Sequence, residues 1–132
     1  MSNFMLKHFP GRFFIHLGDS TKTVPTFIQA NPTFRCDLIF VDGGHTYAIA
    51  KADLENFASI ANRSNRDNAI IFDDYPSFAP GATEMGRAWE HMIRRHRVIE
   101  LMRCMFSNRK SIPPSTKIEQ YVQGFVIGTV IP

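Results

Sequence analysis

The spacing of hydrophobic and polar residues alternates along the chain between a pattern typical of strands and one typical of helices. Short apolar runs rich in aromatic and branched residues predict strands at residues 12–17, 37–41, 69–72, 97–105 and 121–131. Apolar residues at intervals of three and four predict helices at residues 21–30, 47–61 and 83–96. Asp19 or Ser20 is placed to cap the first of these helices.

The order of these segments predicts an α/β fold. Strands alternate with helices through most of the chain, which favours a mostly parallel sheet. The last two strands have no helix between them, so we expect them to form an antiparallel pair. The run at residues 37–41 is almost continuously apolar, as in a strand that is covered on both faces. In sheets of this kind, ligands bind beyond the carboxyl ends of the strands.

Composition agrees with a single globular domain over residues 1–132. Hydrophobic residues make up 44% of the chain and charged residues 20%, values that argue against a disordered or coiled-coil protein. The net charge of +3 is weak evidence for nucleic acid binding, because the basic residues are scattered. No apolar run is long enough for a membrane span and the first residues show no secretory signal, so we expect a cytoplasmic protein with reduced thiols at Cys36 and Cys104.

Carboxylates follow two of the predicted strands at the point where each ends. Asp42 comes after one apolar strand, and Asp73 with Asp74 come after the next, so these side chains can converge. Converging carboxylates repel one another unless a cation or raised pKa values relieve the repulsion, and an all-oxygen set suits Mg²⁺ or another hard divalent ion. The alternative is that these aspartates only cap helices or end strands, as Asp often does.

His45 lies three residues after Asp42, at the start of the next predicted helix. A neutral imidazole there could take a proton from a substrate hydroxyl. It could equally be a helix-start residue that is hydrogen-bonded to a carboxylate. The neighbouring Gly43 and Gly44 permit positive φ values and the close approach of a ligand, although a glycine pair is also common in ordinary turns.

These motifs together resemble a known family. The segment CDLIFVDGGHTYAIAKADL at residues 36–54, followed one helix later by AIIFDDYP at residues 69–76, is similar to class I S-adenosylmethionine-dependent methyltransferases. The likeness is greatest to the group with VDGxH and FDDY motifs, which includes metal-dependent O-methyltransferases. HLGDSTKTVP at residues 16–25 resembles the third strand of that family and the turn after it, and GFVIGTV at residues 124–130 resembles its closing antiparallel strand.

The resemblance implies methyl transfer from S-adenosylmethionine to the hydroxyl of a small molecule, assisted by Mg²⁺ or another divalent cation. It implies that Asp42, Asp73 and Asp74 are metal ligands. It places the catalytic base at His45, with Asp42 as the other group that could take the proton. The donor-binding residues implied by the same likeness are Gly18, Asp19, Ser20, Asp42 and Gly43.

The sequence also departs from the family pattern. Members open with a strand and a glycine-rich loop for the donor, followed by a strand whose terminal acid binds the ribose, and this sequence contains neither. We therefore expect a partial Rossmann-like sheet, the C-terminal portion of the family fold, without the first two family strands. The gap left beside residues 37–41 would be about 10 Å wide, two strand spacings. The chain would close it by moving residues 12–17 across or by pairing with another chain, for instance as a homodimer through the exposed edge, or it would stay partly disordered.

Three functions follow from these observations. The first is an O-methyltransferase, or the C-terminal fragment of one. The second is a catalytically inactive methyltransferase-like module that binds metal or a partner chain. Phosphoryl transfer by the paired aspartates is a weaker third, because no P-loop follows a strand.

Overall fold

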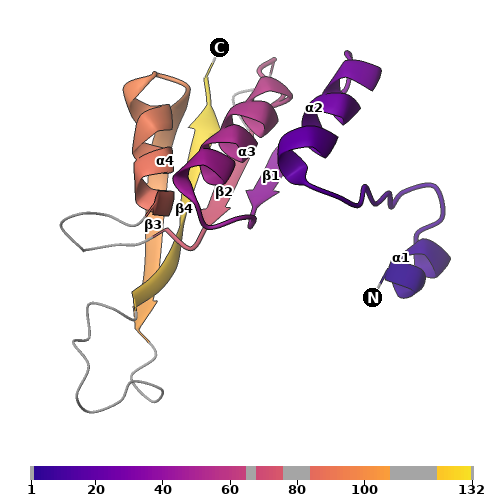
Figure 1. Ribbon diagram of the computed structural model, residues 1–132, viewed down its shortest axis with the longest axis horizontal. Coiled ribbons are helices and arrows are strands. Elements are labelled where there is room, and N and C mark those ends of the chain that lie inside the picture. The colour runs from indigo at the N-terminus through magenta and orange to yellow at the C-terminus, as the bar shows by residue number, and fades with distance from the viewer. Residues whose placement is uncertain (1, 65–67, 76–83, 108–121, 132) are drawn as a thin grey trace.

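The computed structural model describes residues 2–64, 68–75, 84–107 and 122–131. Within these ranges the chain forms helices and a four-stranded sheet (Figure 1). In chain order the elements are α1 (Ser2–His8), α2 (Ser20–Ala30), β1 (Leu38–Val41), α3 (Tyr47–Ser59), β2 (Ala69–Asp73), α4 (Glu84–Arg94), β3 (Val98–Ser107) and β4 (Val122–Val130).

The strand order is β1-β2-β4-β3, and only one pair of strands is parallel. β1 pairs with β2 in parallel, whereas β4 runs antiparallel to both of its neighbours. The antiparallel pairing of the last two strands is thus confirmed, and the mostly parallel sheet is wrong. The reason is that β4 enters between β2 and β3, so two of the three pairings are antiparallel.

The strand predicted at residues 12–17 is also wrong. These residues lie outside the described helices and strands, and most of their apolar side chains are exposed: 74% for Phe14 and 82% for Leu17. The reason is a missing neighbour, since a strand is stabilised by hydrogen bonds to the strand beside it. The short helix α1, which the sequence pattern did not indicate, precedes this segment, and Figure 1 shows both apart from the sheet.

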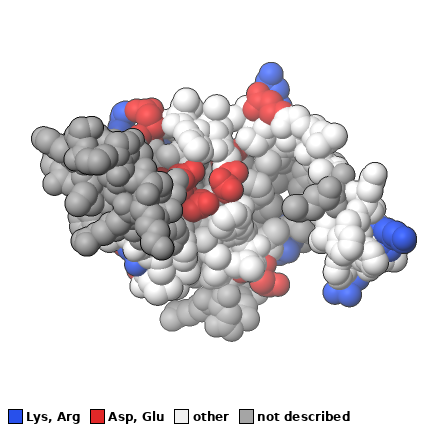
Figure 2. Space-filling model, turned by 90° about the horizontal axis from the view of Figure 1, so that it is seen from below, with Lys and Arg blue, Asp and Glu red and all other residues white. Residues whose placement is uncertain are grey.

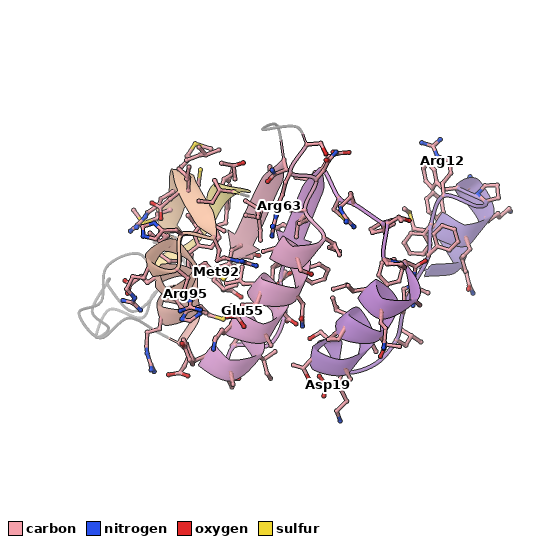
Figure 3. The ribbon with its side chains drawn as sticks, turned by 90° about the horizontal axis from the view of Figure 1, so that it is seen from above. Arg12, Asp19, Glu55, Arg63, Met92 and Arg95 are labelled. Carbon is pink, nitrogen blue, oxygen red and sulfur yellow. The ribbon has the colours of Figure 1, made fainter. Side chains whose placement is uncertain are left out.

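One face of the sheet carries the core. Helices α2, α3 and α4 lie side by side, as Figures 1 and 3 show from two directions. Side chains on the helix-facing side of the sheet pack against α3 and α4: among them Ile39 and Val41 of β1, Ile70 and Phe72 of β2, and Val126 and Val130 of β4. At the centre the rings of Phe72 and Trp89 stack with their centroids 5.9 Å apart.

The opposite face of β1 is not covered by the described residues. Leu38 is 65% exposed and Phe40 is 56% exposed, although both alternate with buried neighbours. The expectation that this strand is covered on both faces is therefore wrong. On β3, Leu101 is likewise 62% exposed. β1 and β3 are the two edges of the described sheet.

Two local features explain where the elements begin and end. Helix α3 stops at Ser59, two residues before the predicted end, because the Ile60 carbonyl accepts a hydrogen bond from the Cys36 amide at 2.8 Å.

The buried Asn68 joins the start of β2 to the end of β4. Its Oδ1 accepts from the Val130 amide at 2.8 Å, and its Nδ2 donates to the Val130 carbonyl at 3.1 Å. These contacts align the start of β2 with the end of β4.

Candidate functional site

The turn between β1 and α3 carries Asp42, Gly43, Gly44 and His45. Both glycines lie outside the left-handed region, so the positive φ values that glycine permits are not used there. They are needed for packing instead. A Cβ atom on Gly43 would lie 2.8 Å from Oδ2 of Asp53, and one on Gly44 would lie 2.8 Å from Cγ2 of Ile49. The turn therefore lies tightly against α3, which fixes the positions of the residues on either side of the glycines.

The start of α3 is held from two sides. The Thr46 hydroxyl accepts a hydrogen bond from the Ile49 amide at 3.4 Å, which caps the helix. The Glu84 carboxylate of α4 accepts from the Tyr47 amide at 2.9 Å. Glu84 is 37 residues away along the chain, and no sequence pattern indicated this contact.

The turn after β2 carries the aspartate pair. Asp73 is the last residue of the strand and pairs with Phe125 of β4. Asp74 has a φ of 52°, in the left-handed region that Asp tolerates better than most residues. The next residue, Tyr75, is buried and donates its amide hydrogen to the Gly124 carbonyl at 3.1 Å. The left-handed residue thus turns the chain sharply between two residues that are both anchored to β4.

The two turns meet. His45 Nε2 lies 3.0 Å from Asp74 Oδ2. One possible ligand atom from each of Asp42, His45 and Asp74 lies within 4.8 Å of the others, and Asp73 is not part of this group. Asp42 and His45 are exposed and Asp74 is half-buried. The two turns therefore converge as the sequence predicted, and the residues that come together are one aspartate from each turn and the histidine. Figure 2 shows acidic side chains gathered near the middle of the face at this end of the sheet.

Two carboxylates and one imidazole form a donor set that fits a divalent cation. Carboxylate oxygens suit Mg²⁺ and Mn²⁺, and an imidazole nitrogen is also a ligand for transition metals. The same geometry serves a proton acceptor, because a carboxylate that is hydrogen-bonded to one ring nitrogen orients the imidazole and stabilises its protonated form. While Nε2 of His45 donates to Asp74, only Nδ1 has a lone pair that can accept a proton or bind a cation.

The third turn, before α2, carries Gly18, Asp19 and Ser20. Gly18 has a φ of 136°, a conformation that favours glycine. Asp19 caps α2, as its position in the sequence predicted: its Oδ1 accepts from the Thr21 amide at 3.0 Å and from the Thr21 hydroxyl at 2.7 Å. These hydrogen bonds lower the pKa of Asp19, so the carboxylate stays charged. Figure 3 shows Asp19 at the start of α2.

A largely apolar cavity of about 900 Å³ opens beside this third turn. It lies between residues 12–18, helix α2 and the region around Cys36 and Ile60, and Gly18 and Ser20 form part of its wall. It thus separates the 12–17 segment from the chain that leads into β1. The sequence predicted a gap in the sheet beside residues 37–41, and none of these residues lines this cavity.

Sequence reasoning missed Asp53. It is 2% exposed, although aspartate is seldom buried without a partner. The signal was present, since Asp53 interrupts the buried face of α3 between Ala50 and Leu54. Its carboxylate lies against Gly43, one residue from Asp42.

Comparison with known proteins agrees with this architecture. A family model described as a methyltransferase domain matches residues 2–75, more than half of the chain. The chain therefore belongs to this methyltransferase family. Membership of the family implies S-adenosylmethionine as the methyl donor. No curated protein matches the chain.

Solved structures of O-methyltransferases share the fold. The crystal structure of an O-methyltransferase from Klebsiella pneumoniae, itself assigned only provisionally, is 14% identical with a TM-score of 0.63; the match covers 99% of this chain and 55% of that one. The apo structure of CalS11, a TDP-rhamnose 3′-O-methyltransferase in calicheamicin biosynthesis, is 18% identical with a TM-score of 0.56. This match covers 90% of this chain and 43% of the CalS11 chain. This chain thus spans about half the length of the structures it matches. Among the described residues, no helix is long and apolar enough to cross a membrane.

Proposed function

We propose that this chain is part of an S-adenosylmethionine-dependent O-methyltransferase that acts on a small-molecule hydroxyl with the help of a divalent cation. The observation that carries the proposal is the convergence of Asp42, His45 and Asp74 at the carboxyl ends of the parallel strands β1 and β2. Methyltransferase family membership supports the donor, and the fold shared with O-methyltransferases supports oxygen as the acceptor. The CalS11 structure favours a sugar hydroxyl as the first substrate class to test.

In this proposal the aspartates hold the cation and His45 moves the proton. The ligands of the cation are Asp42 and Asp74. Asp73, one residue before Asp74, is a further candidate ligand. The cation, when bound, lowers the pKa of the substrate hydroxyl. His45 accepts the hydroxyl proton, and Asp74, 3.0 Å away, orients the imidazole and stabilises its charge. The hydroxyl oxygen then takes the methyl group while the sulfur–methyl bond of the donor breaks, so the sulfonium charge is neutralised and the proton stays on His45.

The third turn is proposed to face the donor. The cavity beside α2 is bordered by Gly18 and Ser20, and Asp19 caps that helix. At the end of β1 lie Asp42 and Gly43. The apolar wall of the cavity suits the flat face of an adenine ring. The polar residues at its mouth supply hydrogen-bonding groups.

Cation binding tests the proposal directly. We expect Mn²⁺ to bind the chain, measured by water-proton relaxation, and Asp42→Asn and Asp74→Asn each to weaken binding by at least about tenfold. Asp37→Asn is the matched control, because Asp37 lies at the other end of β1 and accepts a hydrogen bond from Asn62 at 2.8 Å. Equal losses in all three variants, or no loss in the first two, would contradict the metal site.

Methyl transfer tests the role of His45. With labelled S-adenosylmethionine and a panel of phenols and sugars, His45→Gln should lose most of the turnover, since a positioned base contributes about a hundredfold or more. Mn²⁺ binding should change less in this variant than in Asp74→Asn if His45 is the base. A loss of cation affinity as large as in Asp74→Asn would instead assign His45 as a ligand.

A second function is supported by the free edge of the sheet. β1 is an edge strand with exposed Leu38 and Phe40, and we propose that a second copy of this chain pairs with it as a catalytically inactive homodimer. Light scattering tests this alternative: Phe40→Lys should shift a dimer toward monomer. Leu101→Lys, an equally exposed position on the opposite edge strand, should not. A monomeric wild-type chain that turns over a hydroxyl substrate rules the alternative out.

A further inference from the structure

The start of helix α3 is bound to helix α4 by a contact that the proposed chemistry does not use. The Glu84 carboxylate accepts a hydrogen bond from the Tyr47 amide, with 2.9 Å between Oε2 and the nitrogen. Tyr47 is the first residue of α3, so its amide has no acceptor within its own helix. A carboxylate is a favoured partner there, because the N-terminal end of a helix carries a partial positive charge. Glu84 therefore stabilises the start of α3 in one position against α4.

Arg87 holds the Glu84 side chain from the same helix. Its Nη1 donates to Oε1 of Glu84 at 2.9 Å, so the two carboxylate oxygens have different partners: Arg87 on Oε1 and the Tyr47 amide on Oε2. The Arg87 guanidinium also lies over the Tyr47 ring, 4.8 Å from its centroid, a distance typical of a cation–π contact. The backbone and the ring of Tyr47 are thus both in contact with α4.

The position of His45 depends on where α3 begins. The His45 side chain is 66% exposed, and its Nε2 pairs with Oδ2 of Asp74 at 3.0 Å. An exposed ring has few neighbours packed around it, so the backbone that carries the ring decides whether it reaches Asp74. Tyr47 lies only two residues after His45. A displacement of the Tyr47 amide therefore moves the His45 backbone relative to Asp74.

We propose that Glu84 is a positioning residue, which holds the start of α3 so that the His45 ring meets Asp74. The hydrogen bond to Tyr47 is a property of the fold alone, and its relevance to proton transfer rests on the proposed function. The residue that follows β2 and the residue that begins α4 both contact the stretch from His45 to Tyr47: Asp74 pairs with His45, and Glu84 accepts from Tyr47. Asp74 orients the imidazole directly, whereas Glu84 acts through the backbone.

Two glutamates of α4 provide a matched test of the first step. Glu84→Ala should make the Tyr47 amide exchange with solvent about fivefold faster, the size expected when one hydrogen bond is lost, in ¹⁵N NMR spectra of the full chain. Glu84→Gln should keep most of the protection, because its amide oxygen still accepts. Glu90→Ala is the control, since Glu90 is 46% exposed against 49% for Glu84 and likewise pairs with an arginine of α4, Arg94 at 3.4 Å. Unchanged exchange in Glu84→Ala, or equal acceleration in both alanine variants, would overturn the proposal.

The ring of His45 tests the second step. Its ¹⁵N resonances report which ring nitrogen carries the hydrogen donated to Asp74. We expect Glu84→Ala to shift these resonances toward those of Asp74→Asn, while Glu84→Gln leaves them near wild type. Arg87→Ala should give a smaller shift in the same direction, because the Tyr47 amide keeps its acceptor. If Glu84→Ala speeds the exchange of Tyr47 but leaves the His45 ring unchanged, Glu84 only caps the helix and its positioning role is refuted.

Methyl transfer supplies the arm of the experiment that depends on the proposed function. Glu84→Ala should lower kcat by about tenfold, since misplacing a catalytic group by about 1 Å can cost as much as about a hundredfold. KM for the hydroxyl substrate should stay nearly unchanged, and Glu84→Gln should recover most of the lost kcat. A raised KM with kcat intact would contradict a positioning role. If the wild-type chain shows no methyl transfer, the proposed function fails, while the two NMR comparisons still decide the role of Glu84.

Discussion

Two apolar segments of this chain have a similar, strand-like composition and different structures. Residues 12–17 (RFFIHL) and residues 37–41 (DLIFV) both have the composition of a strand. The second forms β1, which pairs with β2 and buries Ile39 and Val41 against the helices. The first forms no described strand, and Phe14 and Leu17 remain exposed.

A segment with strand propensity forms a strand only beside a partner strand. Residues 38–41 pair with β2 on one side, and Ile39 and Val41 are buried in the core, so the strand gains both hydrogen bonds and burial. Residues 12–17 instead line a cavity of about 900 Å³ that separates them from the region around Cys36. Composition predicts what a segment is suited to become, and the neighbours decide whether it does.

The largest effect is expected from the centre of the packed region. Trp89→Ala removes a fully buried ring that stacks on Phe72 and donates a hydrogen bond from Nε1 to Glu100 at 2.9 Å. We expect a loss of about 3–5 kcal/mol in the free energy of unfolding, measured by urea denaturation. A loss below about 1 kcal/mol would show that the sheet and α4 are no better packed than the 12–17 segment.

A smaller effect, which depends on pH, is expected at Glu100 in the same region. Burial by itself would raise the pKa of Glu100, but hydrogen bonds from Arg103 and Trp89 outweigh it and lower the pKa below its ordinary value of 4.5. The stability from these contacts is therefore fully present above pH 4.5 and is lost as the pH falls through the lowered pKa.

The variant Glu100→Gln removes this dependence. It should be less stable than wild type at neutral pH, and the difference should shrink under acid conditions, as followed by urea denaturation across the pH range. A difference that stays constant with pH would mean that the charge of Glu100 contributes nothing and that only its shape matters.

The smallest effect is expected in the 12–17 segment. Leu17→Ser and Phe14→Ser replace side chains that are 82% and 74% exposed, so the free energy of unfolding should change by less than about 0.5 kcal/mol. Ile39→Ser is the matched control. Ile39 is 4% exposed in β1, so its replacement should lower the free energy of unfolding much more. A large loss from Leu17→Ser would reveal that the 12–17 segment is packed in solution and would remove the contrast between the two regions.

Local sequence signals were sufficient for several elements of the fold. The helices at Ser20–Ala30 and Tyr47–Ser59 and the strand at Ala69–Asp73 agree with the predicted ranges to within two residues. Asp19 was identified as a helix cap because capping depends on the few residues that follow. The meeting of the turns after β1 and β2 was predictable because parallel neighbours end at the same edge.

The details of the candidate site required the tertiary structure. Within the aspartate pair, Asp74 joins Asp42 and His45 while Asp73 does not, and this depends on the left-handed conformation of Asp74 and on pairing to β4. The contacts of Asp53 and Glu84 are made between separate elements of the fold. Strand order, too, was decided by the insertion of β4.

Capping, periodicity and motif spacing act over a few neighbouring residues, so they were enough to predict α2, α3 and α4, most of the strands and the family. Which apolar segment forms a strand, which aspartate reaches His45 and which carboxylate is buried depend on contacts between distant segments. Hydrogen-bond pairing and burial both require groups that only the folded chain brings together.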